Sequence, residues 1–372
     1  MDNYLDKNMV IYDFQAFFQK YGGVSRCFAE AIKEIREENL ADIKIGAIGS
    51  YNYYINAQHI VPALPDWTRN YNFLKKGIPY ANRKLMKYLV KKYPEAVFHA
   101  TYYDPYLIDL KPSKLVCTIH DMIFEKFPYF FNNVEQDIAN KKRYIYESNL
   151  IFAASQKTKD DIMFYYPDIP SNKIQVTYWA TNIADINLPE GNLFDCNYFL
   201  YIGTRNAYKN FETVLKSINK IKAIFKDQNL KLICIGGGRF THYELDLIRK
   251  YELLDLIEQK TLSDEELALY YKNAKAFVFP STYEGFGIPI LEAYACGCPV
   301  ILSNSSCFPE IAGDAALYFD ASDYSELAQI MIDVYTNEGL RNDIINKGKM
   351  RLENYSWKKT ANEMINCYSR LF

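Results

Sequence analysis

Short apolar runs recur along the chain and alternate with longer segments of helical periodicity. In the first half, such runs predict strands at residues 9–12, 43–48, 96–99, 115–119, 150–154 and 174–178. In the second half, they predict strands at residues 198–202, 232–235, 276–279 and 300–302. Continuously apolar strands separated by helices are typical of parallel sheets that are covered on both faces. The pattern therefore predicts an α/β protein.

The clearest unit is a strand, a glycine-rich turn, a helix and a second strand between residues 276 and 302. Pro289 suits the first position of the helix, and Gly297 ends it. The turn before the helix contains Gly285 and Gly287 and exposes backbone N–H groups at a helix N-terminus, which is a usual receptor for phosphate. Open α/β sheets bind ligands at this carboxyl end of their strands.

Two carboxylates lie beside this turn, Glu284 and Glu292, with seven residues between them. A carboxylate next to a phosphate is repulsive unless it has another task, and accepting hydrogen bonds from sugar hydroxyls is the obvious one. The alternative is that Glu292 complements the helix dipole and Glu284 is solvated. The spacing by itself leaves both interpretations open.

The segment STYEGFGIPILEAYACGCPVILSNSSCFPEIAGDAALYFD, residues 281–320, resembles the donor-binding signature of the retaining glycosyltransferases of family 4, also called glycosyl transferases group 1. The resemblance implies the α/β fold named GT-B, with two Rossmann-like domains facing across a cleft. It implies an acceptor-binding domain at 1–182, completed by a C-terminal helix at 355–372 that crosses back to it. The nucleotide-sugar domain would span 183–354, with a linker at 183–196.

The resemblance also assigns roles on the donor side. Glu284 would contact the transferred sugar and Glu292 the nucleotide ribose, and Leu262, in the loop before a helix with a capping-box start, would meet the nucleobase. The backbone amides that would meet the sugar and the diphosphate are those of Gly285, Phe286, Gly287 and Ile288.

Two cations follow the strand at 198–202. Gly203 ends this strand, Arg205 follows two residues later, and Lys209 precedes a helix. A guanidinium and an ammonium at such a strand end can neutralise a diphosphate. The alternative is two solvated loop charges. The resemblance implies that Gly203, Arg205 and Lys209 bind the donor phosphates and that the two cations stabilise the departing diphosphate.

The first half contributes a glycine pair and a histidine. Gly22 and Gly23 precede an amphipathic helix, where they would let a ligand approach the backbone. Arg26 in the first turn opposes the helix dipole, which would suit a bound anion, although it could simply be exposed. His120 directly follows an apolar strand. A histidine there is more often a satisfied core residue, but the resemblance implies that it approaches the transferred sugar.

The implied reaction moves a hexose-type sugar from a nucleoside diphosphate sugar to a saccharide or lipid-linked saccharide acceptor, with retention, in the synthesis of surface glycans such as lipopolysaccharide. The chain has no Asp-x-Asp motif, so neither a metal nor any other cofactor is expected. The alternatives are another GT-B activity, namely a sugar-nucleotide epimerase or a phosphorylase, and an inactive nucleotide-sugar binding module.

Charge and composition restrict the partners. The formal net charge of −2 argues against nucleic-acid binding, and the eight scattered cysteines are expected to be reduced in a cytoplasmic protein. The first residues do not resemble a secretory signal, and no apolar run is long enough to span a bilayer. The stretch 69–92 carries eight basic residues and no acidic one, interleaved with apolar residues. It predicts peripheral contact with the inner membrane leaflet, or else a solvated helix.

Overall fold

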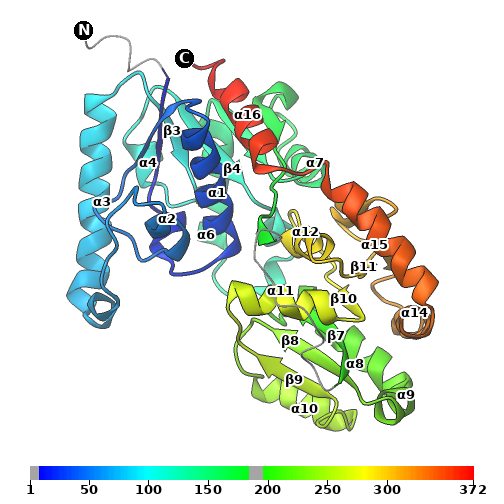
Figure 1. Ribbon diagram of the computed structural model, residues 1–372. Coiled ribbons are helices and arrows are strands. Elements are labelled where there is room, and N and C mark those ends of the chain that lie inside the picture. The colour runs from blue at the N-terminus through cyan, green and yellow to red at the C-terminus, as the bar shows by residue number, and fades with distance from the viewer. Residues whose placement is uncertain (1–7, 184–195) are drawn as a thin grey trace. The chain divides into compact units, whose positions relative to one another are not determined.

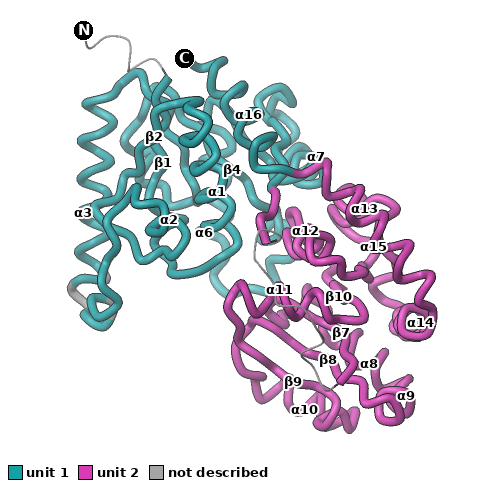
Figure 2. The backbone as a smooth tube through the Cα atoms, viewed as in Figure 1, with its two compact units in different colours: residues 1–179, 356–372 teal, residues 180–355 magenta. Residues whose placement is uncertain are grey.

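The computed structural model describes residues 8–183 and 196–372, without the side chains of Arg69, Asn72, Phe73 and Lys75. The chain divides into two compact units (Figure 2). Unit 1 comprises residues 1–179 and 356–372, and unit 2 comprises residues 180–355. The predicted linker at 183–196 lies, except for its two ends, outside the described residues.

Unit 1 contains a parallel sheet of six strands. They are β1 (Met9–Tyr12), β2 (Asp42–Ile45), β3 (Val97–Ala100), β4 (Leu115–Ile119), β5 (Leu150–Ala153) and β6 (Ile174–Val176). The order across the sheet is β2-β1-β3-β4-β5-β6. The chain therefore first moves from β1 to β2 and then returns past β1 to continue in the opposite direction. All six strands were predicted from the sequence, and the four central strands, β1, β3, β4 and β5, are buried along their whole length, as parallel strands covered on both faces are.

Helices cover both faces of this sheet (Figure 1). They are α1 (Gly23–Glu37), α2 (Tyr53–Ala57), α3 (Asn72–Lys92), α4 (Tyr106–Asp109), α5 (Ile123–Lys126), α6 (Glu135–Glu147), α7 (Gln156–Tyr165) and α16 (Trp357–Tyr368). The apolar stripe of α1 is buried, as its periodicity predicts. The stretch 50–68, which lacks a periodic pattern, was predicted to be irregular but contains α2. This short helix is nucleated by the Asn52 side chain, which accepts the Ile55 N–H at 3.1 Å.

The last helix, α16, packs against α1 within unit 1. Its Tyr368 hydroxyl reaches the sheet, where it shares a hydrogen bond of 2.9 Å with the Tyr12 hydroxyl and one of 2.6 Å with His99 Nδ1. Burial lowers the pKa of His99 to about 3, so the ring is neutral at physiological pH. These buried polar contacts fix the end of the chain on the first sheet.

Unit 2 contains a second parallel sheet of six strands. They are β7 (Asn197–Ile202), β8 (Leu230–Ile235), β9 (Ile257–Lys260), β10 (Ala276–Phe279), β11 (Val300–Ser303) and β12 (Leu317–Phe319), in the order β12-β11-β10-β7-β8-β9. The chain runs from β7 outward to β9 and then crosses to β10 on the other side of β7. The apolar runs did not predict β9 and β12. Both are edge strands and partly exposed, so their sequences are less uniformly apolar.

The helices of unit 2 are α8 (Phe211–Lys220), α9 (Lys222–Asp227), α10 (His242–Lys250), α11 (Asp264–Asn273), α12 (Ile288–Ala295), α13 (Phe308–Ala312), α14 (Tyr324–Thr336) and α15 (Glu338–Leu352). The buried face of α8 joins the sheet in one core. The predicted capping box is present at the start of α11, where Ser263 and Glu266 satisfy each other's backbone N–H groups. The α/β prediction is confirmed in both units.

Candidate functional site

Each sheet has one place where the strand order reverses, between β1 and β3 in unit 1 and between β7 and β10 in unit 2. In open parallel sheets, a crevice for ligands forms at the carboxyl ends of the strands at such a point. Asp13 and Thr101 directly follow β1 and β3, and the loops with Lys209 and Glu284 follow β7 and β10. Most of the predicted site residues therefore lie at the two reversal points or beside them.

In unit 2, the structure brings Lys209 and Glu284 together. Lys209 Nζ lies 2.5 Å from Glu284 Oε1, and each side chain is about 15% exposed. Asn210 connects the two loops, because its side-chain amide donates to the carbonyl oxygens of Pro280 at 3.2 Å and Ala321 at 2.8 Å. The charges of the ammonium and the carboxylate thus neutralise each other, and both groups stay partly exposed to a ligand.

The turn after Glu284 is held by the segment that follows β11. Ser306 Oγ donates to the Glu284 carbonyl at 2.7 Å and accepts the Glu284 N–H at 3.2 Å. Cys307 Sγ donates to the Phe286 carbonyl at 3.2 Å. Gly287 adopts φ 91°, the left-handed region that favours glycine, and leads directly into α12. The backbone from Glu284 to Ile288 is therefore preorganised at a helix N-terminus, as an anion receptor requires.

Glu292 lies in α12 and is buried. Its Oε2 accepts a hydrogen bond of 3.1 Å from the Tyr271 hydroxyl, which comes from α11. The sequence analysis did not identify Tyr271, and its position on the buried face of an amphipathic helix gave no polar signal. Leu262 lies between β9 and α11 at the same carboxyl edge of the sheet and is half-buried.

Arg205 was predicted to grip phosphate, but its side chain is only 1% exposed and is engaged with protein groups. Nε pairs with Glu244 at 2.9 Å, and the guanidinium packs 4.8 Å from the centre of the Phe240 ring. The remaining N–H groups donate to successive carbonyls of the loop after β8, those of Gly236, Gly237, Gly238 and Arg239. Arg205 thus organises this loop, and the sequence analysis missed its partner Glu244.

In unit 1, His120 follows β4 and is half-buried. Its Nε2 donates to the Thr101 carbonyl at 3.1 Å, and its backbone N–H donates to the Tyr103 hydroxyl at 3.0 Å. Burial lowers the pKa of the imidazole, which favours the neutral ring. The loop after His120 is held by a buried ion pair, in which Lys141 Nζ lies 2.9 Å from Glu125 and 3.1 Å from the Asp121 carbonyl.

The glycine pair lies at the start of α1. A Cβ atom on Gly23 would meet nothing within 4 Å, so packing within the described residues does not explain this glycine. The nearest atoms to a Cβ on Gly22 would be those of the flexible side chain of Gln19. The guanidinium of Arg26 lies 5.7 Å from the centre of the Tyr54 ring. The space beside this helix N-terminus suits the close approach of a ligand.

Within residues 8–183 and 196–372, no three histidine, cysteine or carboxylate side chains are grouped so that they could hold a metal ion. The eight cysteines are all free thiols. No helix in this described part of the chain is both long and apolar enough to cross a bilayer.

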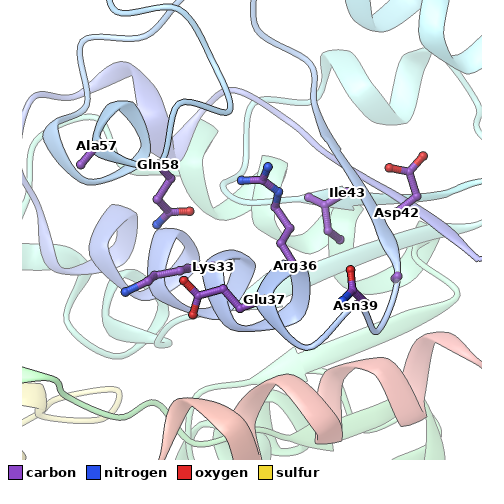
Figure 3. Close-up of a pocket in the computed structure, with 9 residues that line it drawn as sticks. Lys33, Arg36, Glu37, Asn39, Asp42, Ile43, Ala57 and Gln58 are labelled. Atoms are coloured by element: carbon purple, nitrogen blue, oxygen red, sulfur yellow. The ribbon is translucent and has the colours of Figure 1, made fainter.

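An open pocket of about 750 Å³ lies elsewhere in unit 1 (Figure 3). It is lined by side chains from the C-terminal half of α1, including Lys33, Arg36 and Glu37, and by residues at the start of β2 and the end of α2. Parallel strands all begin at the same edge of a sheet. The pocket therefore lies at the edge opposite the carboxyl ends and is not part of the site around His120.

Relatives and solved structures that resemble the chain include the following four. Over 306 residues it is 26% identical to O-antigen chain mannosyltransferase B of Escherichia coli, covering 76% of each chain. It is 27% identical over 286 residues to the serotype-specific mannosyltransferase WbdA of Escherichia coli, but this match spans only 34% of that protein's length. The fold resembles sucrose-phosphate synthase of Thermosynechococcus elongatus (TM-score 0.74, 17% identity, 98% and 99% of the chains). It also resembles Anabaena HepE in complex with UDP-glucose (TM-score 0.72, 15% identity, 98% and 100%).

The fold and these relatives define the class of protein: the chain is a glycosyltransferase with the GT-B fold. Residues 188–351, which make up most of unit 2, match the model of the family described as Glycosyl transferases group 1. The resemblance found in the sequence is thereby confirmed.

Proposed function

We propose that this protein is a retaining glycosyltransferase that moves a hexose-type sugar from a nucleoside diphosphate sugar to a saccharide or lipid-linked saccharide acceptor during the synthesis of a surface polysaccharide. The observation that carries the proposal is the Lys209–Glu284 pair at the reversal point of the second sheet. A cation suits a diphosphate and a carboxylate suits sugar hydroxyls, and here the two lie in contact.

In this proposal, the donor diphosphate lies at the N-terminus of α12, against the amides of Gly285, Phe286, Gly287 and Ile288. Lys209 then stabilises the negative charge of the departing diphosphate. Glu284 accepts hydrogen bonds from the transferred sugar, and Glu292, held by Tyr271, accepts them from the ribose. The complex of HepE with UDP-glucose supports this class of donor.

On the side of unit 1, His120 contacts the transferred sugar and the space beside Gly22 and Gly23 admits a ligand. A neutral imidazole can accept a hydrogen bond from a hydroxyl, which suits this role. Two relatives are mannosyltransferases by name, so mannose is the first sugar to test. We propose no metal and no other cofactor, because the cationic Lys209 and the helix N-terminus supply the charge complement of a diphosphate.

The experiment has two steps. First, thermal shift measurements with GDP-mannose, UDP-glucose and UDP-galactose identify the donor as the compound that raises the melting temperature. Second, products are analysed by NMR with and without a mannose-terminated oligosaccharide, and the anomeric configuration of the new bond is read directly. A product formed only with the acceptor and with retained configuration supports the proposal. An epimerised or phosphorolysed sugar, or an inverted product, would overturn it.

We further propose peripheral contact with a membrane through α3. The side chains of Lys76, Tyr80, Lys84, Lys87 and Lys91 follow one another on one exposed face of this helix, while Ile78, Asn82, Met86 and Leu89 are buried on the other. Tyr80 is 62% exposed, and Lys84 Nζ lies 5.2 Å from the centre of its ring. α3 lies along the outer flank of unit 1 (Figure 1, left). Basic and aromatic residues on one helix face suit an anionic lipid surface.

A further inference from the structure

Asp13 is a buried carboxylate at the reversal point of the first sheet. It directly follows β1, and its side chain has no exposed surface. It makes no ion pair with any described residue, and all of its partners are neutral. Oδ1 accepts the Thr101 N–H at 3.0 Å, the Thr101 hydroxyl and the Gln15 N–H at 3.3 Å, whereas Oδ2 accepts from the side chains of Gln15 and Tyr106. Burying a carboxylate without a cation costs free energy. A neutral side chain would stabilise this turn at a lower cost, so the turn alone does not explain Asp13.

Asp13 binds Thr101, and Thr101 in turn orients His120. The Thr101 N–H and hydroxyl are both bound to Asp13, and the Thr101 carbonyl accepts from His120 Nε2 at 3.1 Å. A carbonyl oxygen only accepts, so the neutral imidazole must carry its proton on Nε2. Nδ1 is then left with a lone pair, and no described residue donates a hydrogen bond to it. The geometry therefore leaves one acceptor atom on His120 for a hydroxyl.

We propose that Asp13 is a positioning residue that, through Thr101, fixes His120 as the Nε2–H tautomer and keeps Nδ1 as a hydrogen-bond acceptor for a hydroxyl of the transferred sugar. The sugar contact rests on the proposed function, but the control of the tautomer does not. The charged groups that act on the imidazole are Asp121, on the loop after β4, and Lys141, on α6, which pairs with Glu125 of α5.

The first test measures the tautomer directly. Histidine ¹⁵N chemical shifts are recorded for the wild type, Asp13→Asn and Asp13→Ala, and the His120 signals are assigned by their loss in His120→Gln. Asp13→Asn keeps an oxygen at the Oδ1 position for Thr101, so it should retain the Nε2–H tautomer. Asp13→Ala should show a mixture of both tautomers. A folded Asp13→Ala protein with unchanged His120 shifts would overturn the proposal.

Asp13→Ala could fail to fold, and Thr101→Val is the second variant. It removes the hydroxyl that Asp13 binds but keeps the backbone carbonyl, and it should move the His120 shifts partway toward the mixture. If Asp13→Ala does not fold, unchanged His120 shifts in Thr101→Val would by themselves overturn the proposal.

The second test is kinetic. Loss of the groups that orient metal ligands typically reduces activity by about 10–100-fold, and we expect a similar factor for a group that orients His120. Asp13→Ala should lower kcat by this factor with little change in the KM of the donor, and Asp13→Asn should restore most of it. The matched control is Asp161→Ala, which removes another buried carboxylate of unit 1, paired with Lys157 in α7. It should not lower kcat. A changed tautomer with unchanged kcat would support the positioning by Asp13 and overturn the sugar contact of His120 in the proposed function.

Discussion

Lys209 Nζ and Glu284 Oε1 lie 2.5 Å apart, although 75 residues separate them in the sequence. Lys209 follows β7 and Glu284 follows β10, and these strands are neighbours in the sheet although two other strands come between them in the chain. Without a ligand, the two charges neutralise each other. The pair lies beside the N-terminus of α12. A bound sugar diphosphate would offer the ammonium a phosphate and the carboxylate a hydroxyl.

Lys209→Ala should reduce kcat by about 10²–10³-fold, because removal of one donor to a developing anion typically costs this much. The measurement is turnover with the donor identified by thermal shift. Lys216→Ala is a matched control, since it removes an exposed lysine of α8 that pairs with Glu212 within the same helix. Full turnover by Lys209→Ala would refute the assignment.

Arg205→Ala should mainly lower stability. Removing one partner of a buried ion pair costs about 3–5 kcal/mol in the free energy of unfolding, because Glu244 and the carbonyls of the glycine loop lose their donors. Urea denaturation measures the change, with Arg249→Ala as the control. Arg249 pairs with Asp246 at the surface, where such pairs contribute about 0–1 kcal/mol. An Arg205→Ala protein of normal stability but without turnover would instead indicate direct contact with the diphosphate.

The combined contribution of Asp13 and His99 to the free energy of unfolding should depend only weakly on pH between about 4 and 6. Burial raises the pKa of Asp13 to about 6, so its contribution to stability is present below the unfolded pKa and is lost as pH rises through 6. Burial lowers the pKa of His99 to about 3, so its contribution is present above the unfolded pKa of 6.5 and is lost as pH falls toward 3. The two slopes have opposite signs in this window.

Asp13→Asn removes the decrease in unfolding free energy with pH that Asp13 causes, and leaves the increase that His99 causes. The unfolding free energy of this variant should therefore increase with pH between about 4 and 6 more steeply than that of the wild type, by up to about 1.4 kcal/mol per pH unit. Urea denaturation at several pH values in this range provides the comparison. Parallel pH profiles for the two proteins would mean that Asp13 does not change its protonation between the folded and unfolded states as its burial implies.

Turnover should survive an excess of EDTA. The described residues contain no group of three metal-binding side chains, and Lys209 with the N-terminus of α12 can complement a diphosphate without a cation. The assay is run with protein that has been dialysed against the chelator. Loss of activity that Mg²⁺ or Mn²⁺ restores would contradict this prediction.

The protein should co-sediment with vesicles that contain anionic lipids and not with neutral ones. Each basic residue near an anionic surface contributes about 1 kcal/mol, and salt screens the attraction. Changing Lys76, Lys84, Lys87 and Lys91 to glutamate should abolish the binding. The charge-matched control changes four exposed lysines of unit 2, Lys220, Lys226, Lys250 and Lys349, to glutamate. Equal recovery with both kinds of vesicle would identify α3 as an ordinary solvated helix.

The sequence by itself determined the class of fold and most of the elements. Buried parallel strands need continuous apolar runs, so the central strands of both sheets were visible in the pattern, together with the edge strands β2 and β6 of the first sheet. The edge strands β9 and β12 were missed because edge positions tolerate polar residues. The sequence also placed His120 directly after a strand, and Lys209 and Glu284 in the loops that follow strands, because polar residues after an apolar run mark the edge of a sheet.

Only the tertiary structure decided which of these residues meet. A sequence pattern shows that a residue follows a strand, but not which strand lies next to it. The order of β7 and β10 joins Lys209 to Glu284, and the order of β1, β3 and β4 joins Asp13 through Thr101 to His120. Arg205 followed a strand in the same way as Lys209, yet the glycine loop after β8 and Glu244 enclose it. Contacts between distant segments depend on how the strands are ordered and how the side chains then satisfy one another, and neither is encoded in local periodicity.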